Sequence, residues 1–360
     1  MEQLSLAPQS QRAITIPFKQ ELVKNGNEYF MNFQFKTKKA TLWADKDFEV
    51  GSEQIAFPNS ISTKWVALPA SKPIHLNDKG DVELIGDNFT ARFSKTNGSL
   101  NSLTYGGKEL MVAPLISSFW RVPTDNDEGG FERSYAARWR KAGLDKTTLI
   151  PVSLQAFKIG ETQVKVVAEN QLKTASGTII QRATYLVNGN GLIEIQQDFT
   201  VPKELPPLAR VGLQMALDKA FDKVEWYGKG PFESYDDRKE AAFVGIHKKE
   251  VKDMFFPYVM PSENGNRSDT RWLKLLSDKA ELLVFSDELF NFNAQNYSDT
   301  ALNKSKETQE LPRGEATYLH IDKAQMGLGG DDSWTPRVHK EYILDDASYS
   351  YKFSIIPRAR

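Results

Sequence analysis

The chain has 360 residues, of which 40% are hydrophobic and 26% are charged, an ordinary composition for a globular protein of two or three domains. A net charge of −1 provides no attraction for nucleic acid or for an anionic membrane. The absence of cysteine excludes disulfides, thiolate metal sites and cysteine nucleophiles. No stretch approaches the roughly 20 apolar residues that cross a bilayer, and Met1–Arg12 lacks the apolar core of a secretory signal. The compartment, cytoplasmic or periplasmic, stays open.

Strand patterns dominate the chain from its first regular segment. Tyr29–Phe35 alternates with period two and is rich in aromatic residues, which is typical of a strand. Asn-Gly and Gly-Gly turns separate further segments of this kind, and only Phe131–Ala142 has a helical pattern. The sequence therefore predicts an all-β protein, with further strands at Glu83–Phe93, Gln163–Glu169, Thr178–Val187, Leu192–Val201, Arg210–Leu217, Leu282–Phe285 and Tyr349–Ile356.

A segment with two prolines and several small polar residues, 60–80, is the predicted linker. It separates a small β module, residues 1–59, from a large one, residues 81–360. The small module offers three or four strands, too few to bury both faces of a sandwich. We therefore expect half a domain, whose other strands are cut away or supplied by another chain. The large module has about fifteen strands or more, which predicts two large packed sheets.

Four motif segments are more polar or glycine-rich than plain strands. The first, 119–130 (FWRVPTDNDEGG), is either a solvated turn or a mobile loop at a site. The second, 226–238 (WYGKGPFESYDDR), is either a site or a loop held by an Asp–Arg pair. The third, 258–272 (YVMPSENGNRSDTRW), contains carboxylate, amide and guanidinium groups, which form a site or a structural network because buried polar groups need partners.

The fourth motif segment, 325–336 (QMGLGGDDSWTP), combines three glycines with two carboxylates and a tryptophan. Sugars are bound by such a combination, in which polar groups contact the hydroxyls and an aromatic ring contacts the C–H face. The alternative is that Trp334 packs inside the protein. The glycines do not form a phosphate loop, because no Lys-Ser/Thr pair and no helix follow them.

Other catalytic classes have little support in the sequence. The four histidines show no spacing typical of a metal site, and no Gly-x-Ser-x-Gly occurs. Carboxylate pairs are abundant, but a glycosidase pair is defined by its separation in space, which the sequence does not give.

Taken together, the four motif segments resemble lacZ-type β-galactosidases of glycoside hydrolase family 2, in the same order along the chain. They match that family's last domain, the β-galactosidase small chain, and the resemblance runs from about Val82 to the end. Residues 4–58 resemble, less sharply, the second half of the immunoglobulin-like domain before it. The resemblance implies a fold: a large antiparallel supersandwich, galactose mutarotase-like, preceded by a partial immunoglobulin-like β-sandwich.

The resemblance also implies site residues. Trp334 corresponds to the tryptophan that stacks on the sugar, and Asp332 and Asn126 are the further substrate-binding candidates. The first segment corresponds to a mobile active-site loop whose glycine, here Gly129, takes part in the movement. We expect this loop to comprise Pro123, Thr124, Asp125, Asp127 and Gly129.

The family's catalytic glutamates lie on a TIM barrel, which takes about 250 residues of alternating strand and helix and has no counterpart here. No catalytic residue and no metal ligand is therefore assigned, and no cofactor is expected in this chain. Magnesium and sodium are implied for the complete enzyme. The expected partners are a β-galactoside or other sugar and the catalytic barrel, in cis or as a large subunit. The family also implies association into oligomers.

The leading hypothesis is thus an accessory part of a β-galactosidase, inactive alone. The incomplete small module favours a fragment of a longer chain over a natural small subunit. The alternatives are an aldose 1-epimerase, which polarimetry on fresh α-galactose would test, and a stand-alone carbohydrate-binding module.

Overall fold

The computed structural model describes residues 6–16, 27–57, 72–312, 314–332, 335 and 337–360. The chain divides into two compact units, residues 1–64 and 65–360. Unit 1 contains an antiparallel hairpin of β1 (Phe30–Lys36) and β2 (Glu49–Ala56). None of the described residues of unit 1 is buried, and Phe35, Trp43 and Ile55 are more than half exposed. This hairpin therefore has no core of its own among the described residues.

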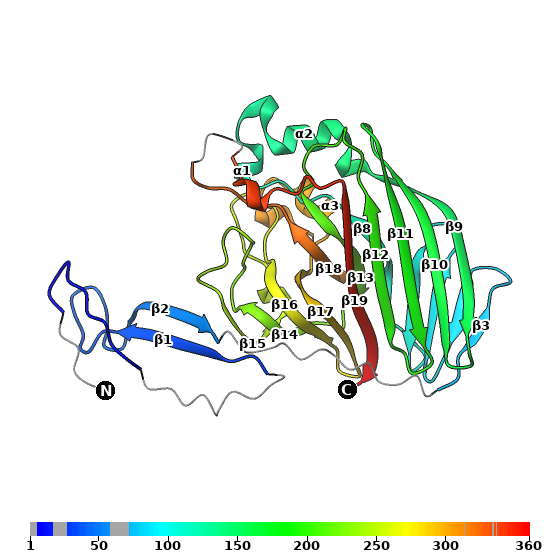
Figure 1. The fold of residues 1–360 in the computed structure, drawn as a ribbon, viewed down its shortest axis with the longest axis horizontal. Coiled ribbons are helices and arrows are strands. Elements are labelled where there is room, and N and C mark those ends of the chain that lie inside the picture. Colours follow the sequence, from blue (N-terminus) through cyan, green and yellow to red (C-terminus); the bar gives the residue numbers. More distant parts are fainter. Residues whose placement is uncertain (1–5, 17–26, 58–71, 313, 333–334, 336) are drawn as a thin grey trace. The chain divides into compact units, whose positions relative to one another are not determined.

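The described residues of unit 2 form two antiparallel sheets (Figure 1). The five-stranded sheet consists of β3 (His75–Asn77), β4 (Val82–Ile85), β5 (Phe89–Ser94), β6 (Ser99–Tyr105) and β7 (Lys108–Glu109). The twelve-stranded sheet consists of β8 (Met111–Ser118), β9 (Thr148–Ile159), β10 (Gln163–Lys173), β11 (Thr178–Asn188), β12 (Ile193–Thr200), β13 (Arg210–Asp218), β14 (Lys223–Gly230), β15 (Phe243–Glu250), β16 (Arg267–Leu276), β17 (Ala280–Gln295), β18 (Ala316–Gln325) and β19 (Ser348–Ala359).

The long strand β17 joins two limbs of the larger sheet. Its first part pairs with β19, which continues through β12, β11 and β10 to β9. Its last part pairs with β18, which continues through β13 to β8. One strand can serve both limbs because residues 287–289 between the two parts are exposed and pair with neither.

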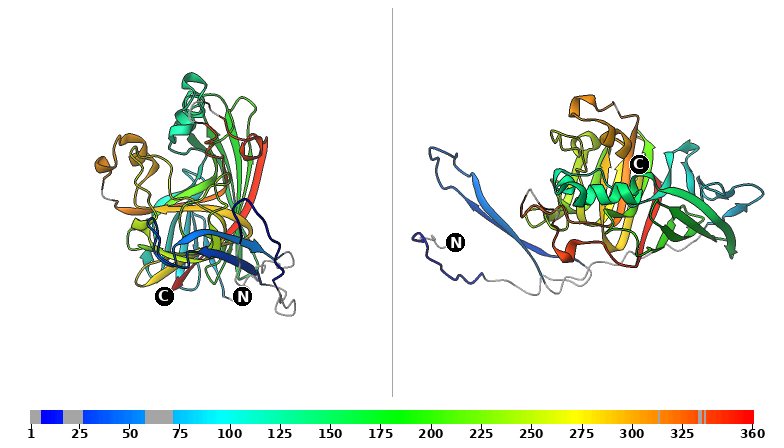
Figure 2. Two further views of the ribbon diagram at one scale, coloured as in Figure 1. Left: turned by 90° about the vertical axis from the view of Figure 1, so that its left-hand side faces the viewer. Right: turned by 90° about the horizontal axis from the view of Figure 1, so that it is seen from above.

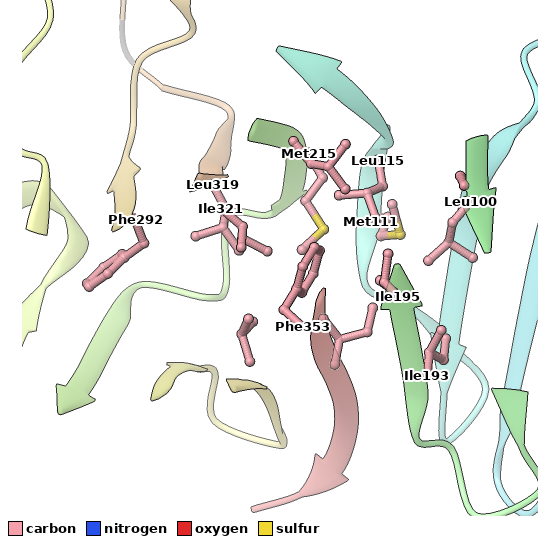
Figure 3. Close-up of a cluster of buried hydrophobic side chains, with 14 of the residues drawn as sticks. Leu100, Met111, Leu115, Ile193, Ile195, Met215, Phe292, Leu319, Ile321 and Phe353 are labelled. Atoms are coloured by element: carbon pink, nitrogen blue, oxygen red, sulfur yellow. The ribbon is translucent and has the colours of Figure 1, made fainter. Parts of the chain in front are cut away.

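Apolar alternation produces the core of unit 2. Along β10 every second side chain is buried, and β11 shows the same period of two. Strands of both sheets contribute to one cluster, and Figure 3 shows part of it around Met215 and Phe353, with labelled residues from seven strands. The labelled members are Leu100, Met111, Leu115, Ile193, Ile195, Met215, Phe292, Leu319, Ile321 and Phe353.

The described part of unit 2 contains three short helices: α1 (Asp125–Glu128), α2 (Tyr135–Ala142) and α3 (Asp299–Lys304). The left view in Figure 2 places α2 at one end of the larger sheet. Its packing follows from Trp139, which is fully buried and donates its indole N–H to the carbonyl of Pro207 at 2.8 Å. Single 3-10 turns occur at Phe131–Arg133, Leu144–Lys146, Val251–Asp253, Thr308–Glu310 and Lys340–Tyr342.

The predicted all-β class with large antiparallel sheets is confirmed. The prediction of one strand at Glu83–Phe93 is wrong, because Asn88 takes φ 68° and turns the chain between β4 and β5. The predicted helix over residues 131–142 begins later, at Tyr135, because Ser134 caps it by accepting from the N–H of Ala137 at 3.0 Å. Strand β3 lies inside the segment 60–80 that we expected to be a linker.

Candidate functional site

The first and fourth motif segments are held together at one end of unit 2. The Arg121 guanidinium donates to the main-chain carbonyls of Met326 and Gly327, the latter at 3.0 Å. The side-chain amide of Asn126 donates to the carbonyl of Leu328 at 3.2 Å. Figure 1 accordingly shows α1 beside the chain that follows β18. Two segments that are some 200 residues apart in sequence thus form one surface.

The second and third segments join the same group. The main-chain N–H of Gly329 donates to Asp237 Oδ2 at 2.8 Å, which connects the fourth segment to the second. The N–H of Glu263 donates to the carbonyl of Val122 at 2.9 Å, which connects the third segment to the first. All four motif segments therefore lie at one place, although the sequence alone could not say that they meet.

A buried ion pair fixes the first segment. Arg121 and Asp127 are at most 1% exposed and form two hydrogen bonds, Nε to Oδ2 at 3.0 Å and Nη2 to Oδ1 at 2.6 Å. Burial lowers the pKa of Arg121, but the attraction of Asp127 outweighs it and the net pKa is raised. Asp127 also accepts from the N–H of Thr124, and the Thr124 hydroxyl accepts from the N–H of Asp127. Thr124 and Asp127 thus form the capping box of α1.

A second buried ionic group, the Arg210 network, lies beneath the third segment. Arg210 Nη2 lies 2.9 Å from Glu263 Oε2, and its Nε lies 3.0 Å from Asp322 Oδ2. The ring of His320 lies 2.8 Å from Arg210 Nη1 and 3.2 Å from Asp299 Oδ1. Burial raises the pKa of Asp322 to about 6, although Arg210 opposes the shift.

We did not single out the Arg210 network from the sequence. Arg210 and Asp322 lie at buried positions of β13 and β18, inside otherwise apolar strands, and a charged residue at such a position was the available signal. Gly212 makes their approach possible, because a Cβ there would lie 1.9 Å from Asp322 Oδ1.

An open pocket of about 320 Å³, here called the site pocket, lies where the segments meet. Its walls come from the first, second, third and fourth segments. They include the side chains of three carboxylates, an amide, two hydroxyls, two phenols and a guanidinium, which can accept from and donate to the hydroxyls of a bound molecule. Lining residues are Thr124, Asp125, Asn126, Glu233, Tyr235, Arg238, Tyr258, Val259, Met260, Ser262, Glu263 and Leu328.

The predicted loop residues divide into two groups. Thr124, Asp125 and Asn126 line the site pocket. Pro123 and Asp127 are buried and do not line it. Asp127 is instead the buried partner of Arg121. The residues around Asp125 and Asp127 are equally polar in the sequence, so the sequence did not distinguish the buried carboxylate from the exposed one.

The remaining predicted residues lie in or beside the fourth segment and at the end of α1. Asp332 Oδ1 accepts from the N–H and the hydroxyl of Thr335, both at 2.8 Å. Trp334 lies outside the described residues. Gly129 has φ −59°, which any residue adopts, whereas Gly130 has φ 93°. The substrate and hinge roles of these residues stay predictions.

Across the described ranges, no group of three or more His, Asp or Glu side chains is arranged to hold a metal ion. No described helix is long and apolar enough to cross a membrane.

Comparison with known proteins gives consistent relatives. The chain is 31% identical to a β-galactosidase of Pseudoalteromonas haloplanktis, with 98% of this chain and 34% of that protein aligned. It is 32% identical to one of Vibrio cholerae, over 92% of this chain and 32% of that protein. The chain therefore spans about a third of the length of these relatives. Among solved structures, a galactose 1-epimerase from Lactobacillus acidophilus aligns at 9% identity with a TM-score of 0.42, over 80% of this chain and 99% of that one.

Family models match both units. The β-galactosidase small chain matches residues 85–355, and β-galactosidase domain 4 matches residues 1–58. The class is therefore that of the carbohydrate-active β-galactosidases. The chain belongs to the β-galactosidase small chain family and corresponds to a carboxyl-terminal β-galactosidase region.

Proposed function

We propose that this chain forms the sugar-facing wall of a β-galactosidase active site and does not hydrolyse a β-galactoside alone. The single observation that carries the proposal is the convergence of the four motif segments on the site pocket, in a chain that belongs to this family. A pocket built from segments distant in sequence, with side-chain amide, carboxylate and hydroxyl groups on its walls, suits a polyhydroxylated ligand.

The binding chemistry is divided among the pocket residues. Asn126 keeps its amide oxygen available to accept from a sugar hydroxyl while its amide nitrogen holds the carbonyl of Leu328. The exposed Asp125 carboxylate adds a charged acceptor. Trp334 would supply the apolar plate, and Asp332 a further acceptor next to it.

Hydrolysis itself needs two carboxylates, one as acid/base and one as nucleophile, at a separation of about 5–5.5 Å for a retaining enzyme. We assign both to a catalytic TIM barrel, in cis or as a large subunit. Magnesium and sodium would be held by that part of the enzyme, and none is assigned to this chain. The reaction is the hydrolysis of terminal β-D-galactosides such as lactose, and the complete enzyme would be an oligomer.

The proposal is tested with a chromogenic β-galactoside. We expect no turnover by the purified 360-residue chain, and turnover once the chain is joined to, or mixed with, a β-galactosidase polypeptide that carries the catalytic barrel. Turnover by the isolated chain, free of contaminating enzyme, would sink the proposal. A failure of the reconstituted enzyme to turn over would also contradict it.

Variants assembled with the barrel separate a sugar role from a structural one. Asn126→Ala and Trp334→Ala should each lower kcat/KM by roughly ten-fold, the effect of about 1.4 kcal/mol of lost transition-state binding. Asn101→Ala is the matched control, because Asn101 is exposed on β6 and does not line the site pocket. Equal kcat/KM in all three variants would remove these residues from the sugar site.

A further inference from the structure

The walls of the site pocket carry charges of both signs. Three of its lining side chains are carboxylates, those of Asp125, Glu233 and Glu263, and one is a guanidinium, that of Arg238. The net charge that a ligand would meet there depends on which of these groups already have an ionic partner.

Glu233 and Arg238 offset each other. Arg238 Nη2 donates to Glu233 Oε1 at 2.6 Å. Glu233 also accepts from the hydroxyl of Tyr258 and, at 2.8 Å, from the N–H of Gly265. This ion pair therefore adds no net charge to the pocket.

Glu263 shares its arginine with other carboxylates. Arg210 is fully buried, does not line the pocket and pairs with Glu263 at 2.9 Å. The same guanidinium lies 3.0 Å from Asp322 and 4.0 Å from Asp299. The ring of His320 accepts from Arg210, because a guanidinium can only donate, and in this arrangement the ring is neutral. One guanidinium thus serves three carboxylates, which leaves an excess of negative charge at this wall.

Asp125, the remaining lining carboxylate, has no ionic partner. It is exposed, and none of the described cations forms an ion pair with it. The other two acidic residues of α1 differ: Asp127 pairs with the buried Arg121 at 2.6 Å, and Glu128 accepts from Arg140 at 2.9 Å. Asp125 therefore presents an uncompensated negative charge to a molecule in the pocket.

We propose that the site pocket selects galactosides by the charge of the group linked to the galactose, and that Asp125 sets this selectivity. Neutral and cationic groups are accepted, and anionic groups are disfavoured. The inference rests on the proposed function and names its substrate class: galactosides of neutral or amino-substituted sugars and alcohols, rather than of sugar acids. The charge acts on the linked group whichever ring lies in the pocket, because screening at physiological salt sets in only over roughly 8 Å.

The test uses three aryl β-galactosides that differ in charge: 4-carbamoylphenyl (neutral), 4-carboxyphenyl (anionic) and 4-(aminomethyl)phenyl (cationic). We measure kcat/KM at pH 7.5 and low ionic strength for the chain assembled with the barrel, as wild type and as Asp125→Asn. Comparing the two proteins on the same galactoside removes the difference in reactivity between leaving groups. Relative to the neutral galactoside, Asp125→Asn should raise kcat/KM for the anion about five-fold and lower it for the cation by a similar factor, as expected for one charge a few ångströms away in water.

Salt separates a charge effect from a change of shape. In about 1 M salt the Debye length falls to about 3 Å, so the five-fold changes should shrink to less than two-fold. Changes that persist undiminished in high salt would arise from shape or hydrogen bonding and would contradict the proposal.

Glu132→Gln is the matched control. Glu132 is exposed on the 3-10 turn after α1 and does not line the pocket, so its loss should leave the selectivity unchanged. The same selectivity in wild type and Asp125→Asn, or an equal change in Glu132→Gln, would overturn the proposal. If the assembled wild type does not turn over even the neutral galactoside, the proposed function itself fails, and this inference fails with it.

Discussion

Unit 2 buries polar side chains in two different ways. Strands β10–β12 carry a neutral row in which Asn170 donates to Gln181 at 3.1 Å and Gln181 donates to Gln197 at 2.7 Å. Strands β13 and β18, nearer the motif segments, bury the Arg210 network instead. A neutral amide row costs little to bury and fixes the register of neighbouring strands. Burying an ionic group costs far more free energy unless every charge is paired. The Arg210 network lies next to the motif segments, where it can hold side chains of the site in position.

The largest expected effect follows from breaking the other buried ionic group near the motif segments, the Arg121–Asp127 pair. Asp127→Ala leaves Arg121 buried without a carboxylate, with only the carbonyls of Met326 and Gly327 as partners. We expect the free energy of unfolding to fall by about 3–5 kcal/mol, as measured by urea denaturation. Asp125→Ala, at an exposed position of the same helix, should change it by less than about 0.5 kcal/mol. Similar losses in the two variants would mean that the pair does not stabilise the segment.

A pH titration tests the Arg210 network. The pKa of Asp322 rises from 3.8 to about 6 on folding, so the folded state holds this proton more tightly than the unfolded state. The contribution of Asp322 to stability is therefore present below pH 3.8 and is lost as the pH rises to about 6, by up to about 3 kcal/mol.

Asp322→Asn removes this dependence. Between pH 4 and 6 the stability of the variant relative to the wild type should therefore move in the variant's favour, even if the variant is less stable at every pH. Urea denaturation at several pH values measures the trend. A constant difference between the two proteins over this range would show that Asp322 titrates normally in the folded state.

The neutral row should respond less. Gln181→Leu leaves Gln197 Oε1 without the amide donor of Gln181 inside the core and leaves Asn170 Nδ2 with only the carbonyl of Gly98, and we expect a loss of about 1–3 kcal/mol. Gln171→Leu, at an exposed position of β10, is the control and should be near neutral. A loss as large as that of Asp127→Ala would show that the neutral row and the buried ionic groups do not differ in their contribution to stability.

The strands of the neutral row and the region of the motif segments also differ in how far the sequence predicted them. Period-two alternation located β10, β11 and β12, because each strand buries one face and turn residues bound it. The motif segments were found as polar, glycine-rich stretches, and the family resemblance predicted a site there. What the sequence could not give is pairing in space. Asp125 and Asp127 look alike in the sequence, yet one is exposed and the other is buried against Arg121.

The Arg210 network escaped prediction for the same reason. A single arginine in RVGLQMALD is compatible with an edge strand or a solvated face. Only the pairing of β13 with β18 brings Arg210 and Asp322 together and makes both of them buried partners. Likewise, local spacing gave no indication that Arg267 would be buried and would donate to main-chain carbonyls.

The smallest expected effect concerns the glycines at the end of α1, where the family resemblance implies a hinge at Gly129. Gly130 takes φ 93°, a conformation that costs a residue with a Cβ about 1–2 kcal/mol, whereas Gly129 takes φ −59° and ψ 138°, which alanine adopts freely. Gly130→Ala should therefore destabilise the isolated chain by about that amount in urea denaturation, and Gly129→Ala should not. If Gly129 acts as a hinge, Gly129→Ala should instead alter kcat and KM of the assembled enzyme. It should leave the stability of the loop conformation described here unchanged, because strain would arise only in the other loop conformation. Unchanged stability and unchanged kinetics in Gly129→Ala would exclude that role and leave Gly130 as the position where the backbone requires glycine.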